Sequence, residues 1–285
     1  MTIWTELSNV DYHHGFVPVN GLRTRFLQAG SGEPVIMLHG TSGHLEAFVR
    51  NIVDLSESFE CHALDMAGHG YTDGPDEDYR IPTYVEHVIG YMDARGISRA
   101  HFIGESLGGW VAGRLAADHP DRVRSLVLVA PGGTVANPPV MERIRNSTRA
   151  AVGSDDRELT RRRLELLMHN SADVTDELVD VRHAIYHRPQ FVAQIEHLLC
   201  LQTMENRLED ILSAEQMAQI CAPTRIVWGA ENPFGEIPEA QRMHSLISGS
   251  ELEIYSECGH WPQHEHAERF NSEVRSFFEK VSVNA

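Results

Sequence analysis

The sequence predicts an α/β protein whose mostly parallel sheet is covered by helices on both faces. Strand-like apolar runs alternate with helix-like segments over residues 1–133, and the same alternation resumes over residues 223–285. Between them, residues 134–222 contain no strand-like run. Alternating strands and helices imply parallel strands joined by crossover helices. We therefore expect one core domain, formed by 1–133 and 223–285, with the intervening segment inserted into it.

The elements of the first part follow in a regular order. Asn20-Gly21 lies between two apolar-rich runs and predicts a hairpin. The run PVIMLHG predicts a strand buried on both faces, and FECHALDMAGHG predicts a strand that enters a glycine-rich loop. IPTYVEHVIGYMDARG has the spacing of a helix. RAHFIG, WVAGRLAADHP and RVRSLVLVAPGG then predict a strand, a helix that ends before Pro120, and another buried strand.

The inserted segment 134–222 is expected to be a helical cap domain. Its charged, amphipathic stretches include RELTRRRLELLMH and TDELVDVRHAIYH. A cap over the carboxyl edge of the sheet would cover the place where open α/β folds bind ligands. The run Arg161-Arg162-Arg163 is expected to be a solvated helix face and not an anion site. After the cap, PTRIVWG, EAQRMHSL, SELEIYS and AERFNSEVRSFFEKV predict a strand, a helix, a strand and a final helix.

The composition narrows the class of partner. The 285 residues carry a net charge of −17, which disfavours nucleic acid and anionic membrane surfaces. The chain has no signal-peptide pattern and no apolar run of membrane-spanning length. Its cysteines match no zinc spacing, and no dinucleotide fingerprint occurs. We expect a cytoplasmic protein that acts on a small molecule without a metal or cofactor. The sequence leaves open whether the chain forms a homo-oligomer such as a dimer.

The strongest motif is Gly104-Glu105-Ser106-Leu107-Gly108, which lies between a predicted strand and a predicted helix. This is the G-x-S-x-G pattern in the strand–turn–helix context that it requires. So tight a turn leaves no room for side chains two residues before and after the nucleophile, and glycine occupies both positions. The motif predicts Ser106 as a nucleophile, with the Leu107 N–H directed at a developing oxyanion.

The loop His39-Gly40-Thr41-Ser42-Gly43 follows the strand PVIML and is expected to complete the oxyanion hole. The Thr41 N–H is the candidate donor, because Gly40 allows the backbone to approach closely. His39 is expected to be a structural histidine of this loop.

The general base is expected at His260, in the sequence CGHW after the last predicted strand. A loop at the end of that strand can reach the same sheet edge as Ser106. In folds that carry the G-x-S-x-G turn, the catalytic residues follow one another along the chain as serine, acid and histidine. His260 lies C-terminal to Ser106, as this order requires.

Four stretches together resemble the α/β-hydrolase superfamily over nearly the whole chain: HG near residue 40, DMAGHGYTDGP, GESLGGW and CGHW. The resemblance implies a mostly parallel eight-stranded sheet flanked by helices, with a helical cap. The finer similarity is to meta-cleavage product hydrolases, which split carbon–carbon bonds in 2-hydroxy-6-oxo-hexa-2,4-dienoates. ECGHWPQHEHAERFN, VTDELVDVRHAIYHRP and the GG after LVLVAP carry this finer similarity.

The resemblance also implies substrate contacts. A cap helix of the family presents a substrate-binding arginine, which falls on Arg182, and Trp261 would line the pocket beside the base. The residue before the nucleophile touches the acidic end of the substrate in the family. It is usually asparagine, but here it is Glu105. With Ser42 of the oxyanion loop, these are the expected substrate-binding residues. The loop HGTSGHLEAF also lacks the family's usual G-P-G.

The family's acid falls at the third residue after the glycine of WGAENPFG, which is Asn232. Asn232 could orient the imidazole through its side-chain oxygen, as in Cys-His-Asn proteases. Alternatively, Glu231 or Glu236 of the same loop could reach the histidine. Asn232 could also be an introduced replacement of aspartate, or Asn-Pro could merely begin a turn.

Two further functions compete with carbon–carbon bond hydrolysis. The first is a carboxylesterase acting on a small ester, such as an aromatic one, because a carboxylate at Glu105 would repel a dienoate anion unless Arg182 or a proton neutralises it. The second is a ligand receptor or cofactor-free oxygenase on the same fold, because position 232 lacks a carboxylate.

Overall fold

The computed structural model describes residues 3–283 and confirms the predicted fold class. One eight-stranded sheet has the strand order β1-β2-β4-β3-β5-β6-β7-β8. The strands are β1 (Tyr12–Val19), β2 (Leu22–Ala29), β3 (Pro34–Leu38), β4 (Glu60–Leu64), β5 (Ala100–Glu105), β6 (Val123–Val129), β7 (Thr224–Gly229) and β8 (Glu251–Tyr255).

The sheet is antiparallel only at one end. β1 pairs with β2, and β2 with β4, in antiparallel registers, whereas every pair from β4 to β8 is parallel. The predicted hairpin joins β1 to β2 through Asn20 and Gly21, whose φ angles are 48° and 85°. Two successive positive φ angles match the right-handed twist of a hairpin, which explains the Asn-Gly pair.

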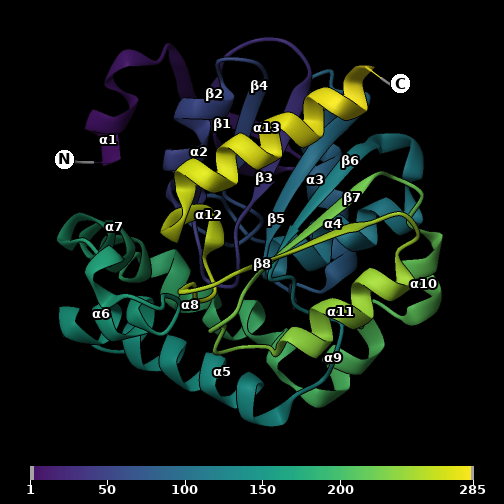
Figure 1. The fold of residues 1–285 in the computed structure, drawn as a ribbon. Coiled ribbons are helices and arrows are strands. Elements are labelled where there is room, and N and C mark those ends of the chain that lie inside the picture. The colour runs from purple at the N-terminus through teal and green to yellow at the C-terminus, as the bar shows by residue number, and fades with distance from the viewer. Residues whose placement is uncertain (1–2, 284–285) are drawn as a thin grey trace.

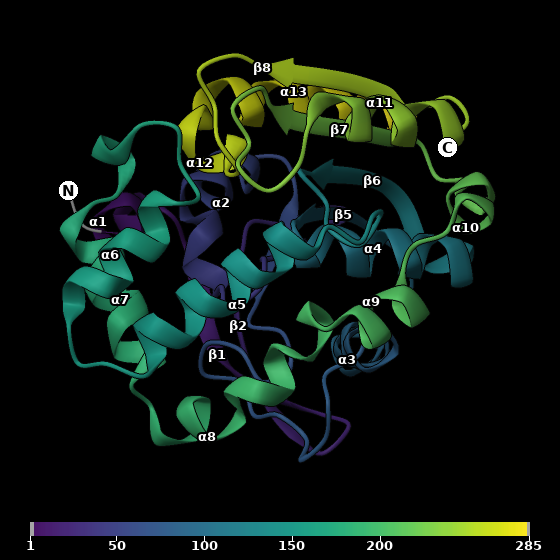
Figure 2. The same ribbon diagram turned by 90° about the horizontal axis from the view of Figure 1, so that it is seen from below.

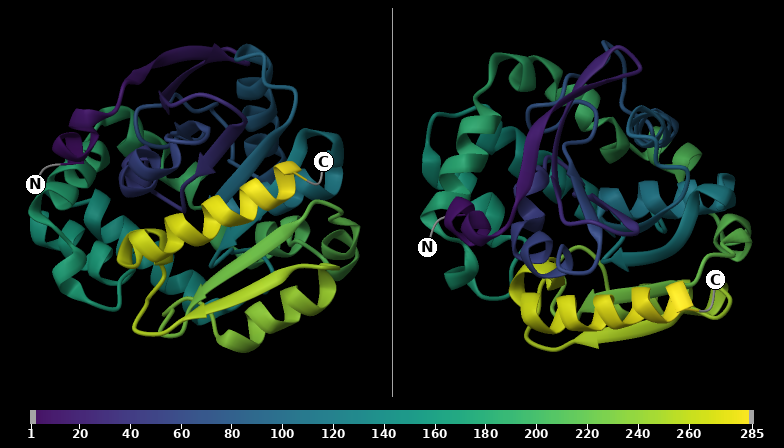
Figure 3. Two further views of the ribbon diagram at one scale, coloured as in Figure 1. Left: turned by 45° about the horizontal axis from the view of Figure 1, so that its top comes forward. Right: turned by 90° about the horizontal axis from the view of Figure 1, so that it is seen from above.

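Helices cover both faces of the sheet, and each face has its own apolar core. α3 (Ile81–Ala94), α4 (Leu107–Asp118) and α11 (Ile237–Leu246) pack on one face, and α2 (Val49–Leu55) and α13 (Ala267–Val283) on the other. Figure 3 shows α13 running along one face of the sheet. Successive residues of a strand alternate between the two cores: Ile36 and Leu38 of β3 join the first, and Val35 and Met37 the second. This explains why the central strands read as continuous apolar runs.

The segment between β6 and β7 contains six α-helices and no strand in the part that the structure describes. They are α5 (Pro138–Val152), α6 (Arg157–Glu165), α7 (Asp176–Tyr186), α8 (Pro189–Leu198), α9 (Met204–Asp210) and α10 (Ala214–Gln219). α5 to α8 gather at one end of the molecule (Figures 1 and 2), whereas α10 packs against α4 and α11. The domain boundaries at 134 and 222 stay a prediction.

Short helical segments complete the described chain: α1 (Ile3–Glu6), α12 (Pro262–Glu265), and 3₁₀ turns at Leu7–Asn9, Leu45–Phe48, Pro120–Arg122, Ser171–Asp173 and Cys200–Gln202. No helix within residues 3–283 combines the length and apolar character that crossing a bilayer requires.

The parallel strands bring distant parts of the chain to one edge. β3, β5, β7 and β8 all end there and are followed by Thr41, Ser106, Asn232 and His260 respectively. The predicted catalytic residues therefore meet because the strands that precede them are parallel.

Candidate active site

Ser106 occupies the sharp turn between β5 and α4. Its φ and ψ angles are 52° and −111°, a strained conformation for a residue other than glycine. A Cβ at Gly104 would lie 2.4 Å from the Gly108 carbonyl oxygen, and one at Gly108 would lie 2.0 Å from the Leu38 carbonyl oxygen. Both glycines are thus required by the close approach of backbone, as the motif predicts.

Two adjoining cavities lie beneath the cap helices, and both are bordered by Thr41, Ser106, Ile144, Phe234 and His260. We call the first the arginine cavity, because Arg163 and Arg182 lie in its wall with Glu105 and Trp261. We call the second the tryptophan cavity, because Trp110 and Trp228 lie in its wall. Ser106 and His260 stand where the two cavities meet, so a bound molecule could extend to either side of the nucleophile.

His260 is held on the loop between β8 and α12. Its backbone N–H donates to the Leu167 carbonyl of the cap at 2.6 Å, and its Nδ1 lies 2.9 Å from Asn232 Oδ1. Asn232 Oδ1 also accepts the Phe234 N–H at 3.1 Å. Because this second bond requires an oxygen, it fixes the orientation of the amide. His260 consequently donates from Nδ1 and carries its lone pair on Nε2.

The two acidic residues of this loop do not reach the imidazole. Glu231 accepts the Cys258 backbone N–H at 2.8 Å, and this bond directs it along the loop. Glu236 is exposed just before α11. Of the alternatives for the third member of a triad, the structure brings Asn232 to His260 Nδ1 and places Glu231 and Glu236 elsewhere.

Glu105 approaches the opposite nitrogen of the same ring. Its Oε1 lies 3.3 Å from His260 Nε2, and its side chain is 1% exposed. Burial raises the pKa of Glu105 to about 8, although Gly40, Arg182, Arg163 and Trp261 all act to lower it. A carboxyl group thus stands beside the nitrogen that is predicted to accept the proton of Ser106.

His260 is buried and neutral at physiological pH. Burial, assisted by the positive charge of Arg163, lowers its pKa from 6.5 to about 3. A neutral imidazole with a free lone pair on Nε2 is the form required of a general base.

The predicted oxyanion donors lie beside the nucleophile. Thr41 borders both cavities and Leu107 borders the tryptophan cavity. Their role as donors stays a prediction. His39 is completely buried, with Nδ1 2.9 Å from the Gly40 carbonyl and Nε2 accepting the Met66 N–H at 3.1 Å. These bonds agree with a structural role for His39 in the loop.

Arg182 of α7 points into the arginine cavity and is 1% exposed. Its Nε donates to His44 Nε2 at 3.2 Å, whereas its Nη2 is buried without a partner. Its guanidinium carbon lies 5.3 Å from the centre of the Trp261 ring. A buried guanidinium with an unused donor is suited to hold a carboxylate of a ligand.

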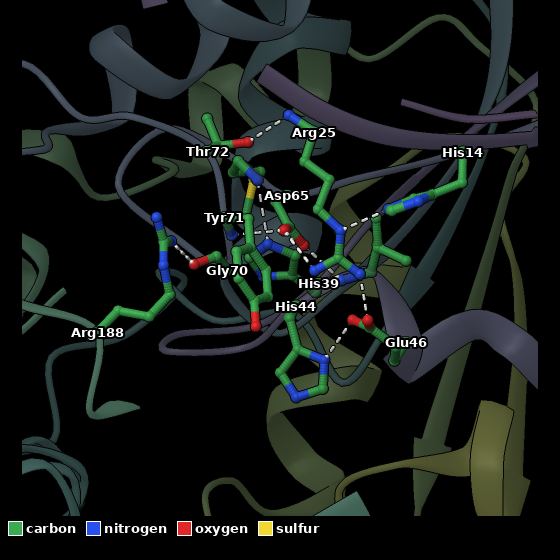
Figure 4. Close-up of polar contacts among 12 residues, drawn as sticks. His14, Arg25, His39, His44, Glu46, Asp65, Gly70, Tyr71, Thr72 and Arg188 are labelled. Atoms are coloured by element: carbon green, nitrogen blue, oxygen red, sulfur yellow. Dashed lines mark hydrogen bonds and ion pairs between the residues drawn. The ribbon is translucent and has the colours of Figure 1, made fainter. Parts of the chain in front are cut away.

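A buried polar chain supports Arg182 from behind. His44 Nδ1 lies 2.8 Å from Glu46, which also pairs with Arg25, and Arg25 contacts Asp65 at 3.2 Å. Figure 4 shows the Arg25 guanidinium between these two acids, with His44 beyond Glu46. Because Arg182 donates to His44 Nε2, His44 must donate from Nδ1 to Glu46. Burial lowers the pKa of His44 to about 4, which keeps this neutral tautomer.

The expectation that Arg161-Arg162-Arg163 forms a solvated face is wrong for Arg163. This side chain is 3% exposed and borders the arginine cavity, and its Nη1 is buried without a partner. Thr160, Arg163 and Leu164 are the buried residues of α6. Together with Leu167 they repeat with helical spacing, a signal that could have placed Arg163 on the inner face.

Ser42 does not border either cavity in the part of the chain described. It is buried and its hydroxyl lies 3.0 Å from the Tyr186 hydroxyl, and its role in substrate binding stays a prediction. Trp261 does border the arginine cavity, where it was expected.

The wall of the tryptophan cavity is unexpectedly polar. Gln202 Oε1, Trp228 Nε1 and Asn232 Nδ2 are buried there without hydrogen-bond partners. Arg207 of α9 also borders this cavity, with Nε donating to the Val135 carbonyl at 2.9 Å. None of these side chains except Asn232 was singled out in the sequence.

The described residues contain no group of three or more His, Cys, Asp or Glu side chains arranged to hold a metal ion.

The fold and this constellation define an α/β-hydrolase. The profile of the alpha/beta hydrolase fold family matches residues 33–267, so the chain belongs to that family. It is 31% identical to a 2-hydroxymuconate semialdehyde hydrolase from Pseudomonas sp. strain CF600, over 93% of each chain.

Two further comparisons agree with this assignment. The chain is 30% identical to a 2-hydroxy-6-oxo-6-phenylhexa-2,4-dienoate hydrolase from Burkholderia cepacia, over 90% of this chain and 93% of the relative. The crystallised meta-cleavage product hydrolase from Pseudomonas fluorescens IP01 superposes with a TM-score of 0.81 at 28% identity, covering 93% and 97% of the two chains.

Proposed function

We propose that the chain hydrolyses the carbon–carbon bond between C5 and C6 of a 2-hydroxy-6-oxohexa-2,4-dienoate, the class of substrate for which its relatives are named. The observation that carries the proposal is the buried Arg182, which borders the cavity that contains Ser106 and His260 and whose Nη2 has no hydrogen-bond partner. An ester without a carboxylate would leave this Nη2 donor unsatisfied, which is costly in a buried site.

The two cavities divide such a substrate at its scissile bond. The dienoate half lies in the arginine cavity with its carboxylate on Arg182, and the acyl half lies in the tryptophan cavity. This brings the 6-oxo carbon to Ser106, between the Thr41 and Leu107 amides that receive the oxyanion.

His260 moves the protons of the reaction. It first assists transfer of the 2-hydroxyl proton to C5, which converts the dienol to its keto form. Nε2 then accepts the Ser106 proton as Oγ attacks C6, and the broken C5–C6 bond leaves its electron pair on the dienoate half, which takes up that proton. Water hydrolyses the acyl-serine with His260 again as the base.

The polar wall of the tryptophan cavity favours an acyl half with a polar end. Trp228 and Asn232 offer donors, Gln202 offers an acceptor, and Arg207 carries a positive charge because burial lowers its pKa only to about 10. Glu239 lies in the same wall, where burial raises the pKa of its carboxyl and Thr134 donates to it, so its charge opposes that of Arg207 less than an ordinary carboxylate would. An acyl chain that ends in a carboxylate would satisfy these groups, whereas an unsubstituted phenyl ring would bury them unpaired.

The proposal is tested by mixing the purified protein with yellow ring-fission products that differ only in the acyl group. Loss of visible absorbance, fastest for the carboxylated acyl chain and abolished in Ser106→Ala, is the expected result. Rapid turnover of p-nitrophenyl acetate with persistent yellow colour would instead identify a carboxylesterase. Absence of both reactions, with no labelling of Ser106 by a fluorophosphonate, would favour a receptor.

A further inference from the structure

We propose that Glu105 supplies, at Nε2 of His260, the negative charge that a carboxylate at position 232 would supply at Nδ1. Glu105 and Asn232 lie on opposite sides of one imidazole, 3.3 Å and 2.9 Å from its two nitrogens. The carboxylate thus stands before the nucleophile and the amide at the acid position, the reverse of the residue types that the resemblance implies for these two positions. The inference rests on the proposed roles of Ser106 and His260.

Asn232 performs only half of the task of a triad acid. Its Oδ1 holds the ring and fixes the tautomer, because the Phe234 N–H keeps that oxygen turned toward His260. An amide carries no charge to stabilise the imidazolium that forms when Ser106 is deprotonated. In a serine protease, exchange of the acid for asparagine lowers kcat by about 10⁴. A second source of negative charge is needed.

Glu105 is placed to be that source. Its Oε2 is buried without a hydrogen-bond partner, so its carboxyl is not fully occupied by structural bonds. The groups that face it come from four elements: the Gly40 amide after β3, Arg163 of α6, Arg182 of α7, and His260 and Trp261 before α12. The positive charges of the two guanidinium groups oppose the effect of burial on the pKa of this carboxyl, so the carboxylate forms at a pH near 8.

The charge acts during proton transfer. When Nε2 accepts the proton of Ser106, the imidazolium forms beside the Glu105 carboxylate, and their attraction is strong because both groups are buried. The proton then leaves Nε2 for the dienoate half, and above the pKa of Glu105 its carboxylate is ionised before and after the step. No additional proton donor or acceptor is required.

The pH dependence follows from the same pair. Glu105 stabilises the imidazolium only when it is ionised, and its pKa is raised to about 8. The value of kcat/KM for the wild type should therefore rise as the pH increases through about 8. A variant with glutamine at position 105 should lack this rise.

The kinetic test is a double-mutant cycle with Glu105→Gln and Asn232→Asp. We expect Glu105→Gln to lower kcat about 100-fold, the lower end of the range for general acid–base contributions. Asn232→Asp should restore at least about tenfold in the Glu105→Gln background, a larger gain than the same substitution gives in the wild type. Equal effects of Asn232→Asp in both backgrounds, or full activity of Glu105→Gln, would overturn the proposal.

A second readout needs no substrate. The ¹⁵N resonance of His260 Nε2 should shift with a midpoint near pH 8 in the wild type and stay constant over that range in Glu105→Gln. His264 is a matched control, because burial also lowers its pKa to about 3 but its Nε2 faces the Asp173 carbonyl and no carboxylate. Identical His260 titrations in the two proteins would refute the assignment.

The two readouts separate the failure of this inference from failure of the proposed function. If no dienoate is cleaved but the His260 resonance titrates with Glu105, the pairing stands and the proposed substrate is wrong. Should Glu105→Gln fail to fold, Glu105→Asn removes the same carboxylate in a smaller side chain and is expected to give the same results.

Discussion

At the scale of single residues, Arg162 and Arg163 are chemically identical neighbours with different surroundings. The Arg162 side chain is 69% exposed, whereas Arg163 is buried in the wall of the arginine cavity. The adjacent pair therefore provides a matched test of whether this cavity binds an anion.

We predict that Arg163→Gln raises the KM for a dienoate at least about tenfold, because a charged hydrogen-bonding group near the substrate carboxylate is lost. Arg162→Gln should leave KM within about twofold, as is usual for exposed positions. Steady-state kinetics on the two variants check the prediction. Equal effects of the two substitutions would show that Arg163 does not contribute to anion binding.

Some residue roles could be predicted from the sequence and others could not. Ser106 and His260 could, because each follows a predicted parallel strand in a recognisable motif. The contact of Glu105 with His260 Nε2 could not, since it depends on how the end of β5 lies relative to the loop before α12, 155 residues further along the chain. The bond of Ser42 to Tyr186 similarly joins the core to the cap.

At the scale of elements, the close approach of α4 to β3 is what makes the nucleophile turn possible. A Cβ at Gly108 would lie 2.0 Å from the Leu38 carbonyl oxygen, so the helix could not begin where it does. Gly113 lies on the same helix, but a Cβ there would meet only the end of the Leu212 side chain at 3.0 Å.

We predict that Gly108→Ala destabilises the protein by at least about 2 kcal/mol, or abolishes activity through displacement of Ser106, because backbone cannot yield as a side chain can. Gly113→Ala should be nearly neutral, since the gain in helix propensity offsets a small adjustment of Leu212. Urea unfolding and kcat of both variants give the comparison. A stable, active Gly108→Ala protein would contradict this account of the turn.

The elements of the sheet were more predictable than the inner surface of the cap. Strand patterns are local and repeat in each α/β unit, and every strand predicted from an apolar run is present. The orientation of cap helices depends on what they cover. Consequently, the polar side chains that α6 and α9 contribute to the cavities, Arg163 and Arg207, were not expected there.

At the scale of the whole molecule, histidine is used unusually often as a buried, neutral side chain. Burial lowers the pKa of a group of histidines well below 6.5: His39, His44, His69, His87, His101, His260 and His264. In the unfolded chain these side chains would bind protons below about pH 6.5, whereas in the folded state they would not. Acidification should therefore favour unfolding.

We predict that the free energy of unfolding is greatest near neutral pH and falls steadily between about pH 6.5 and 4, because the unfolded state then binds more protons. The raised pKa values of Asp65 and Glu105, about 6 and 8, act in the opposite direction, but these two groups are outnumbered. Urea unfolding at a series of pH values measures the effect. A midpoint that stays constant from pH 7 to 5 would contradict it.

This α/β-hydrolase is expected to cleave a carbon–carbon bond by hydrolysis. The most direct test is the reaction of a 2-hydroxy-6-oxohexa-2,4-dienoate with the wild-type protein in H₂¹⁸O, followed by mass spectrometry of both products. The account predicts 2-hydroxypenta-2,4-dienoate without label and the acyl half as a carboxylic acid that has gained one ¹⁸O atom. Recovery of the intact dienoate would contradict it, provided that a separate sample of the same protein is labelled at Ser106 by a fluorophosphonate and is therefore folded and reactive.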